Sequence, residues 1–467
     1  IEDVVFRGNF VLDINIEIDG EGGALYAERD SNVVVRRSLF EENEAALAGG
    51  AVYGGVSYDE CNFRRNDALQ GGAGYVTLTP LVNPAYTACV FEENRAFCFS
   101  VCQKDGGALW GETVVTDCLF VANEAFGRGG AVWGGQIFDS TFLANRTTSP
   151  PDETSNVEGG AAWGADLVGC TLAENEAVGT VPMGLAAEAL GGGAAHSTLA
   201  YCELYDNVAT HGGGVHNSDL DRCTLYGNQA SIAGDGVHSN LPTVIDSSIL
   251  WNNGVEIADV GDVVSVTYSD VEGGWPGAGN VDMDPAFMSA FARDFHLQPS
   301  SVAIDAGNPG KFDPMGSRAD MGAHPYGPGY VPEPFPYCTA KLASAGCEAS
   351  IGWVGEPRLS GGNFTLTAED VLGGSFGMLI WSYEPDNQPF FGGVLCLNSA
   401  VRTPPMLSGG NPGAMDCTGT MAFDFAPGYA SAMGVLPYDG IYAQWIYRDP
   451  PANSVNGSDA LNFVMLP

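Results

Sequence analysis

The sequence predicts an all-β chain, in which a parallel β-helix of about ten or eleven coils precedes a small β-sandwich domain. Two short motifs recur together along the first part of the chain, and a proline-rich segment follows the last copies. The chain has 467 residues, of which 64 are glycine, about twice the usual share. No collagen triplet accompanies the glycine, so the repeat must explain it.

The first motif is F/L-x-x-N, and each copy ends on an asparagine. These ten residues are Asn9, Asn43, Asn66, Asn94, Asn123, Asn145, Asn175, Asn207, Asn228 and Asn253. One period of twenty to thirty residues is enough for a coil of two or three short strands, which is stable only when stacked on its neighbours. We expect asparagine at the corner to tolerate the left-handed region and its amide to pair with the asparagines above and below.

The second motif is Gly-Gly-Ala-aliphatic followed by a ring. Its nine ring positions are Tyr26, Tyr53, Tyr75, Trp110, Trp133, Trp163, His196, His216 and His238. If the preceding aliphatic side chain faces inward, the rings form an outward stripe that could bind glycans or a protein partner. If alanine and the ring face inward, the rings belong to the core, and the sequence leaves both options open.

Histidine replaces tyrosine or tryptophan in the last three copies of the second motif. Three stacked imidazoles could bind a transition metal or respond to pH, whereas any flat ring would also serve simply to stack. We favour the stacking interpretation.

Cysteine supports the same register, because six cysteines stand two residues before the Phe or Leu of the first motif. Residues two apart share a face of a strand, so we expect an internal column of small buried side chains, Cys61, Cys89, Cys118, Cys170, Cys202 and Cys223. Cys98 and Cys102 lie in a loop insertion and are expected to pair with each other.

Composition divides the chain into four regions. The repeats cover residues 1–264, a cap region follows at 265–326, a proline-rich linker spans 327–336, and residues 337–467 form the last domain. About seven short alternating apolar runs, separated by Gly, Pro and Asn, predict a β-sandwich there. Of the three possible pairings of its four cysteines, we predict Cys338–Cys347 and Cys396–Cys417.

The paired motifs resemble the repeats of chlamydial polymorphic outer membrane proteins and of bacterial secreted right-handed parallel β-helix proteins. Further segments resemble the end of the β-helix in choice-of-anchor surface proteins: 248–253, 266–275, 279–287 and 303–307. The closing D-x-G-A-Y-E of that group is Asp320-Met-Gly-Ala-His-Pro here, so its last turn departs from the pattern. The resemblance implies export and a surface location, with no enzymatic activity.

The net charge is −39, from 57 acidic and 18 basic residues, only three of which are lysine. So acidic a chain is a poor ligand for nucleic acids or anionic membranes. Calcium is the natural partner of so many carboxylates, and candidate ligands lie in the cap region, although we favour a solvated acidic surface as the explanation for them. The candidates are Asp282, Asp284, Asp305, Asp313 and Asp320.

Many parallel β-helices cleave polysaccharides, which requires either paired carboxylates or a basic cleft. Acid pairs such as Asp219 and Asp221 arise by chance in this composition, and three lysines fit an acidic substrate poorly. We therefore predict no enzyme and no required cofactor; the alternative is a glycan-binding or polysaccharide-degrading β-helix.

No apolar run is long enough to span a bilayer, and the first residues do not resemble a signal peptide, so export would require a signal already removed. The first strand, from Val4 to Asn9, already fits the repeat. Either an upstream region precedes it or the first coil stacks on another subunit, which would give filaments. We therefore expect an extracellular or cell-surface protein that adheres or self-assembles, whose partners are its own copies or surface glycans.

Overall fold

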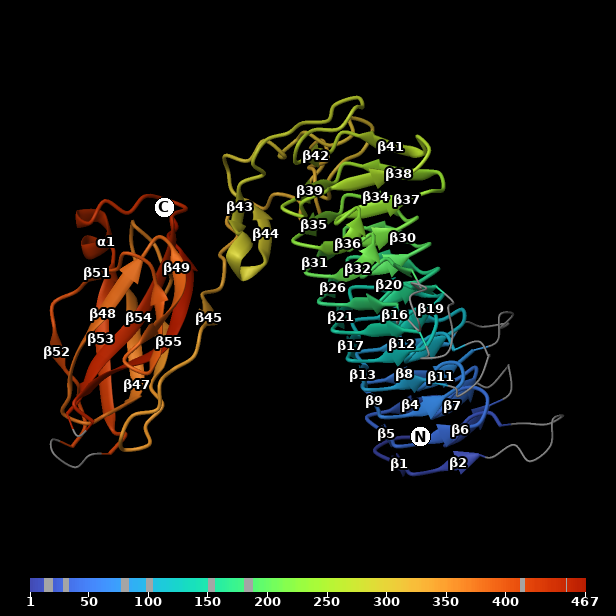
Figure 1. Cartoon of the computed structure of the whole chain (residues 1–467), viewed down its shortest axis with the longest axis horizontal. Helices are drawn as coiled ribbons and strands as arrows, with labels where there is room; N and C mark the ends of the chain where they lie inside the picture. The colour runs from blue at the N-terminus through green and yellow to red at the C-terminus, as the bar shows by residue number, and fades with distance from the viewer. Residues whose placement is uncertain are drawn as a thin grey trace. The chain divides into compact units, whose positions relative to one another are not determined.

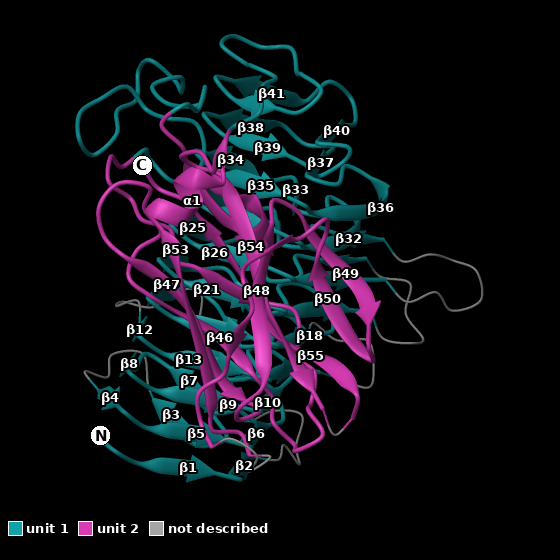
Figure 2. Ribbon diagram, turned by 90° about the vertical axis from the view of Figure 1, so that its left-hand side faces the viewer, with its two compact units in different colours: residues 1–285, 300–326 teal, residues 286–299, 327–467 magenta. Residues whose placement is uncertain are grey.

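The computed structural model describes residues 1–11, 20–27, 33–76, 84–97, 104–149, 156–179, 188–411, 416–450 and 452–467. Their contacts divide the chain into two compact units, which Figure 2 shows in different colours. The first unit comprises residues 1–285 and 300–326, and the second comprises 286–299 and 327–467. The prediction of an all-β chain with a parallel β-helix is confirmed, because the first unit consists of long parallel strand stacks (Figure 1).

Each coil of the first unit, here called the rod, contributes strands to four parallel sheets rather than to the two or three expected. The strands are only two to five residues long, so one or two more strands than expected fit into one period. Sheet 1 follows the Cys/Ser corner and contains, in spatial order, β1 (Val5–Arg7), β5 (Leu39–Glu41), β9 (Asn62–Arg64), β13 (Val90–Glu92), β17 (Leu119–Val121), β21 (Thr141–Leu143), β26 (Thr171–Ala173), β31 (Glu203–Tyr205), β35 (Thr224–Tyr226), β39 (Ile249–Trp251) and β42 (Asp270–Val271).

Sheet 2 follows the asparagine corner. It contains β2 (Phe10–Val11), β6 (Glu44–Ala45), β10 (Asp67–Ala68), β14 (Arg95–Ala96), β18 (Glu124–Ala125), β22 (Arg146–Thr148), β27 (Glu176–Val178), β32 (Val208–His211), β28 (Ala189–Leu190) and β23 (Val157–Glu158), with β36 (Gln229–Ala233) paired to β32.

Sheet 3 follows the Gly-Gly corner and carries the rings. It contains β3 (Leu25–Ala27), β7 (Val52–Gly54), β11 (Gly74–Tyr75), β15 (Leu109–Trp110), β19 (Val132–Trp133), β24 (Ala162–Trp163), β29 (Ala194–Ala195), β33 (Val215–His216), β37 (Val237–Ser239) and β40 (Ile257–Asp259).

Sheet 4 closes each coil and leads into sheet 1 of the next. It contains β4 (Val34–Arg36), β8 (Ser57–Asp59), β12 (Ala85–Thr87), β16 (Val114–Thr116), β20 (Gln136–Phe138), β25 (Asp166–Val168), β30 (Thr198–Ala200), β34 (Asp219–Asp221), β38 (Thr243–Asp246) and β41 (Val264–Thr267). The inward side chains of sheets 1, 3 and 4 form one continuous core, in which the phenylalanines of sheet 1 stack on each other. Sheet 2 contributes a separate small cluster of Val157, Ala177, Ala189 and Ala209.

The Gly-Gly corner shows why glycine repeats at this point of the coil. Gly49 has a φ of +64°, which is favourable only for glycine, and a Cβ on Gly50 would lie 2.1 Å from the carbonyl oxygen of Gly72 in the next coil. The first glycine therefore makes the turn, and the second allows neighbouring coils to approach.

The paired strands of the second unit are all antiparallel. Its larger sheet contains β45 (Phe335–Tyr337), β55 (Ser454–Val464), β54 (Gly440–Asp449), β48 (Phe376–Ser382), β51 (Val401–Arg402) and β52 (Met406–Leu407). Its smaller sheet contains β46 (Ser350–Val354), β47 (Phe364–Val371) and β53 (Gly419–Ala426), and both sheets share one core. Its remaining elements are the hairpins β43 (Phe287–Ser289)–β44 (Asp294–Leu297) and β49 (Pro385–Phe390)–β50 (Gly393–Leu397), the 3₁₀ turn η1 (Ala290–Ala292) and the short helix α1 (Gly428–Ala432).

Candidate functional site

The rings of sheet 3 form a column on the outside of the rod, here called the ring column: Tyr26, Tyr53, Tyr75, Trp110, Trp133 and Trp163. The aliphatic residues that precede them, such as Val52, Leu109 and Val132, are buried in the core, so the rings point outward. Neighbouring ring centroids are 4.4–5.4 Å apart with interplanar angles of 3–15°. Because the rings stack face to face, the faces that a sugar would need for stacking are covered by the next ring.

Polar neighbours hold the ring of Trp163. The Trp163 indole N–H donates to Glu158 at 2.7 Å, and the Arg128 guanidinium lies 4.5 Å from the Trp163 ring centroid. Arg128 is held in turn by Asp105 at 2.7 Å. Tyr26 is 55% exposed and Trp110 only 7%, and the other four rings of the column are half-buried.

His196 does not occupy the ring position that the sequence motif assigned to it. In the strand register Trp163 pairs with Ala195, and Ala195 pairs with His216. Gly191, at a φ of +71°, makes the turn, so the motif begins one residue earlier than predicted. His196 follows at a φ of +51°, and its ring still contacts those of Trp163 and His216 at 5.7 and 5.6 Å.

His211 joins these histidines although the repeat gave no reason to expect it. It lies on β32 in sheet 2, and its ring centroid is 4.9 Å from that of His238. The Nδ1 atoms of His216 and His238 are 3.0 Å apart. Four of the six histidines of the chain therefore gather at one corner of the rod, where burial and the neighbouring imidazoles lower the pKa of His216 to about 3.

The ten asparagines form a continuous ladder. Each side-chain amide donates to the side-chain oxygen of the next asparagine at 2.8–3.0 Å, from Asn9 to Asn253. Their backbone is not left-handed; the residue before each one is, as at Glu93 with a φ of +54°. The ladder ends on Glu256, which accepts from the backbone and side chain of Asn253, and whose pKa burial raises to about 7.

The six column cysteines are buried and free, as small core side chains. In the second unit the predicted pairing is wrong, because the disulfides are Cys338–Cys396 and Cys347–Cys417. Cys338 follows β45 at one edge of the large sheet, where the β50 hairpin brings Cys396 within reach, with 6.3 Å between the Cα atoms. Proximity in sequence did not indicate proximity in the fold. Cys98 and Cys102 lie outside the described residues.

Three of the five predicted calcium ligands, Asp282, Asp313 and Asp320, already accept hydrogen bonds from backbone N–H groups. Asp320 accepts from the backbone N–H groups of Asp305 and Tyr326, and Asp313 accepts from that of Asp320. Asp282 accepts from Gly273, and Met283 donates to the buried Asp270. In the part of the chain that the structure describes, no three His, Cys, Asp or Glu side chains are grouped so that they could hold a metal ion.

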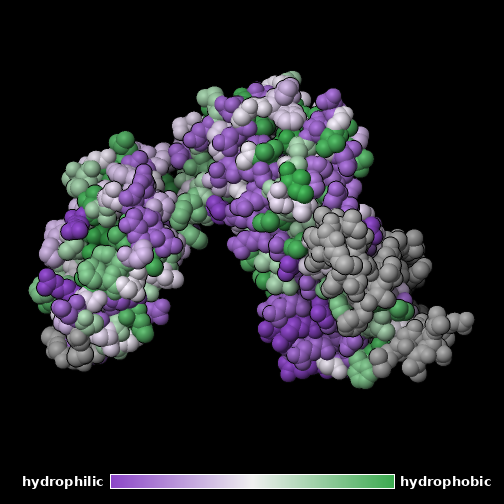
Figure 3. All heavy atoms as spheres, in the orientation of Figure 1, coloured by the Kyte–Doolittle hydropathy of each residue, from purple (hydrophilic) through white to green (hydrophobic). Residues whose placement is uncertain are grey.

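Arginines on the rod pair with carboxylates of the adjacent coil. Among the described residues, each arginine from Arg7 to Arg146 has such a partner, and several pairs are direct strand neighbours, as in Arg64–Glu92 and Arg95–Asp67. Figure 3 shows the resulting hydrophilic surface over β1, β5 and β9.

No model of a known protein family matches the sequence, and no curated protein is similar enough to count as a match. Within the described ranges, no helix has the length and apolar character needed to cross a membrane.

Proposed function

We propose that the protein is an exported, non-catalytic structural protein of the cell surface or extracellular matrix, which acts by adhesion or self-assembly. The observation that carries this proposal is that the repeated rings, asparagines and arginines of the rod bind to the neighbouring coil rather than forming a site for a ligand. Rings stack on rings, asparagines bond asparagines and arginines pair with carboxylates, so these groups hold coil to coil.

Two further observations support an extracellular scaffold. The two disulfides of the second unit fit an oxidising location. The motifs that resemble choice-of-anchor surface proteins point in the same direction. The alternative, a glycan-binding face on the ring column, is less favoured because the stacked rings cover each other's faces.

A polysaccharide panel tests this proposal against the catalytic alternative. The full chain is incubated with neutral and acidic polysaccharides, and released reducing ends and unsaturated products are measured. We expect no release above the heat-treated protein, while pull-down on cells of the source organism retains the chain. Turnover that disappears when one acidic pair is substituted would contradict the proposal.

A further inference from the structure

The large sheet of the second unit has an outer face that the β49–β50 hairpin covers only in part. Strand register places three rows of side chains across it. The first row is Val455, Arg448, Phe376 and Leu407; the second is Gly457, Ile446, Met378 and Pro405; the third begins with Gln444, Ile380 and Arg402. The hairpin covers the Gln444 end of the third row, where Gln444 bonds to the backbone of Val394 and Cys396. Arg402, at the other end of that row, is exposed.

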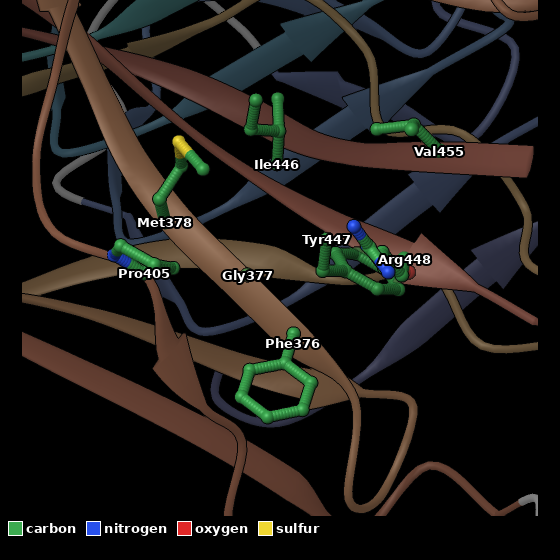
Figure 4. Close-up of a pocket in the computed structure, with 8 residues that line it drawn as sticks. All are labelled: Phe376, Gly377, Met378, Pro405, Ile446, Tyr447, Arg448 and Val455. Carbon is green, nitrogen blue, oxygen red and sulfur yellow. The ribbon is translucent and has the colours of Figure 1, made fainter.

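The first two rows remain open and form an apolar groove of about 450 Å³. Gly457 contributes no side chain to the second row, and Phe376 is 56% exposed. Figure 4 shows Met378 and Pro405 on one side of the groove, Ile446 and Val455 on the other, and Phe376 and Arg448 near its end. Such a concave apolar site is suited to a ligand with apolar side chains.

One arginine lines this groove and a second lies on the same outer face, and neither has an ion-pair partner among the described residues. Arg448 lines the groove, and Arg402 shares the outer face because it is the strand partner of Ile380. Residues 330–467 hold only four basic side chains against twelve acidic ones. The other two basic side chains of this region already have partners. Arg358 pairs with Glu356, and Lys341 donates to the carbonyl oxygens of Phe391 and Val455.

The spacing of the two cations limits what they could recognise together. Arg448 and Arg402 lie two strands apart and about four residues apart along β48, which places their backbones roughly 16 Å from each other. An extended chain covers that distance in about five residues. A ligand that uses both therefore needs two carboxylates separated by several apolar side chains.

We propose that this groove docks an extended, acidic and apolar peptide segment of a protein partner, with its apolar side chains in the groove and its carboxylates on Arg402 and Arg448. Charge complementarity selects this occupant, because an anionic ligand pairs the two cations that the domain itself leaves unpaired. The groove lies within the second unit, so the proposal stands apart from the function of the rod.

Fluorescence anisotropy with the full chain tests it. The probe is a fluorescein-labelled eight-residue peptide with glutamate at positions 2 and 7 and leucine and alanine between them, and the matched peptide carries lysine in place of both glutamates. We expect saturable binding of the acidic peptide alone, weakened by raised salt. Arg448→Glu and Arg402→Glu are each expected to raise its Kd at least five-fold, and Arg448→Gln to give a smaller increase.

Arg358→Glu is the matched control, since it makes the same charge change in the same domain away from the groove, and it should leave the Kd unchanged. Thermal melts verify that each variant is folded. Failure of the acidic peptide to bind, equal binding of the lysine peptide, or an equal loss in the control would overturn the proposal. Arginine-dependent binding of oligogalacturonate without peptide binding would instead assign the groove to an acidic glycan.

Discussion

Besides the Gly-Gly corner, each coil turns at two corners on a single residue with left-handed backbone, and most of these residues are not glycine. Glu60 and Glu93 have φ values of +53° and +54°, directly before Cys61 and Asn94. That conformation costs about 1 kcal/mol outside glycine, so the side chain that follows must hold the corner. Asn94 does so by donating to the carbonyl oxygen of Phe63 and to Asn123.

Asn123 lies in the middle of the ladder, and its side chain makes four hydrogen bonds, two as donor and two as acceptor. Asn123→Ala should lower the free energy of unfolding of the rod by about 3 kcal/mol, because it also leaves buried backbone groups without partners. Denaturant unfolding followed by circular dichroism measures this. Asn62→Ala, at an exposed position of the same repeat, should cost less than about 0.5 kcal/mol. Equal losses would show that the ladder contributes no stability.

Asp270 is a buried carboxylate whose Oδ2 atom has no hydrogen-bond partner among the described residues. Burial, reinforced by the charges of Asp282 and Asp284, raises its pKa to about 6. Since the unfolded pKa is about 3.9, the proton stabilises the folded state fully below pH 4, and this contribution is lost as the pH rises through 6.

Asp270→Asn should therefore stabilise the protein by about 1–3 kcal/mol at pH 8 and leave its stability nearly unchanged at pH 4. The Asn oxygen can still accept from the Met283 N–H. Melting temperatures at the two pH values test this, and an equal gain at both would mean that the charge is not the cause.

At the scale of the element, sheet 3 shows how a sequence repeat can mislead by one residue. Three consecutive glycines, Gly191 to Gly193, offer two alignments of the Gly-Gly corner, and the ring rule favours the one that puts His196 in the column. The backbone instead requires the left-handed turn at Gly191 and close approach at Gly192, where a Cβ would lie 2.3 Å from the Gly213 oxygen. Backbone packing therefore set the strand register at this coil, and the pattern of ring residues in the sequence did not reveal it.

Substitution should separate the close approach that Gly50 allows from the cost of a left-handed backbone alone, which Gly164 shows. Gly50→Ala places a Cβ against the Gly72 backbone and should cost more than about 4 kcal/mol or prevent folding of the rod. Gly164→Ala is the control. Gly164 has a φ of +63°, but nothing lies within 4 Å of the added Cβ, so we expect the free energy of unfolding to fall by only about 1–2 kcal/mol. Thermal melts of both variants compare them, and similar losses would contradict the role of close approach.

The histidine corner should make the rod sensitive to acid. The pKa of His216 is lowered to about 3, first by burial and then by His238, His196 and His211, while Glu158 lies near His196 and Glu188 acts on His238. Because the folded pKa lies below the unfolded value of about 6.5, the stability that neutral His216 contributes is present above pH 6.5 and lost as the pH falls toward 3.

His216→Phe keeps a ring in the column and removes this titration. When the pH is lowered from 7 to 5, the free energy of unfolding of the wild type should fall by about 2 kcal/mol more than that of the variant. The melting temperature of the rod at both pH values gives the difference. In the control His296→Phe, which lies in the second unit, the melting temperature of the rod should change between pH 7 and pH 5 as in the wild type. If His216→Phe shows the same change as the wild type, His216 is not the source of the acid sensitivity.

For the whole molecule, the sequence was most informative where structure is periodic. The spacing of Asn and Gly-Gly predicted stacked coils, because each repeat meets the same environment in the next coil. The disulfide pairing of the second unit was wrong, because contacts such as Cys338–Cys396 depend on which strands of an antiparallel domain become neighbours. His211 was missed for a related reason: it approaches His238 from another sheet, outside the motif.

The most direct test of the structural role is immunogold electron microscopy of the cells that make the protein, with an antibody against the C-terminal unit. The proposal predicts label on the outer cell surface or on extracellular rods or fibres, and loss of that material when the chain is deleted. Label confined to the cytoplasm, or surface material unchanged by the deletion, would contradict it.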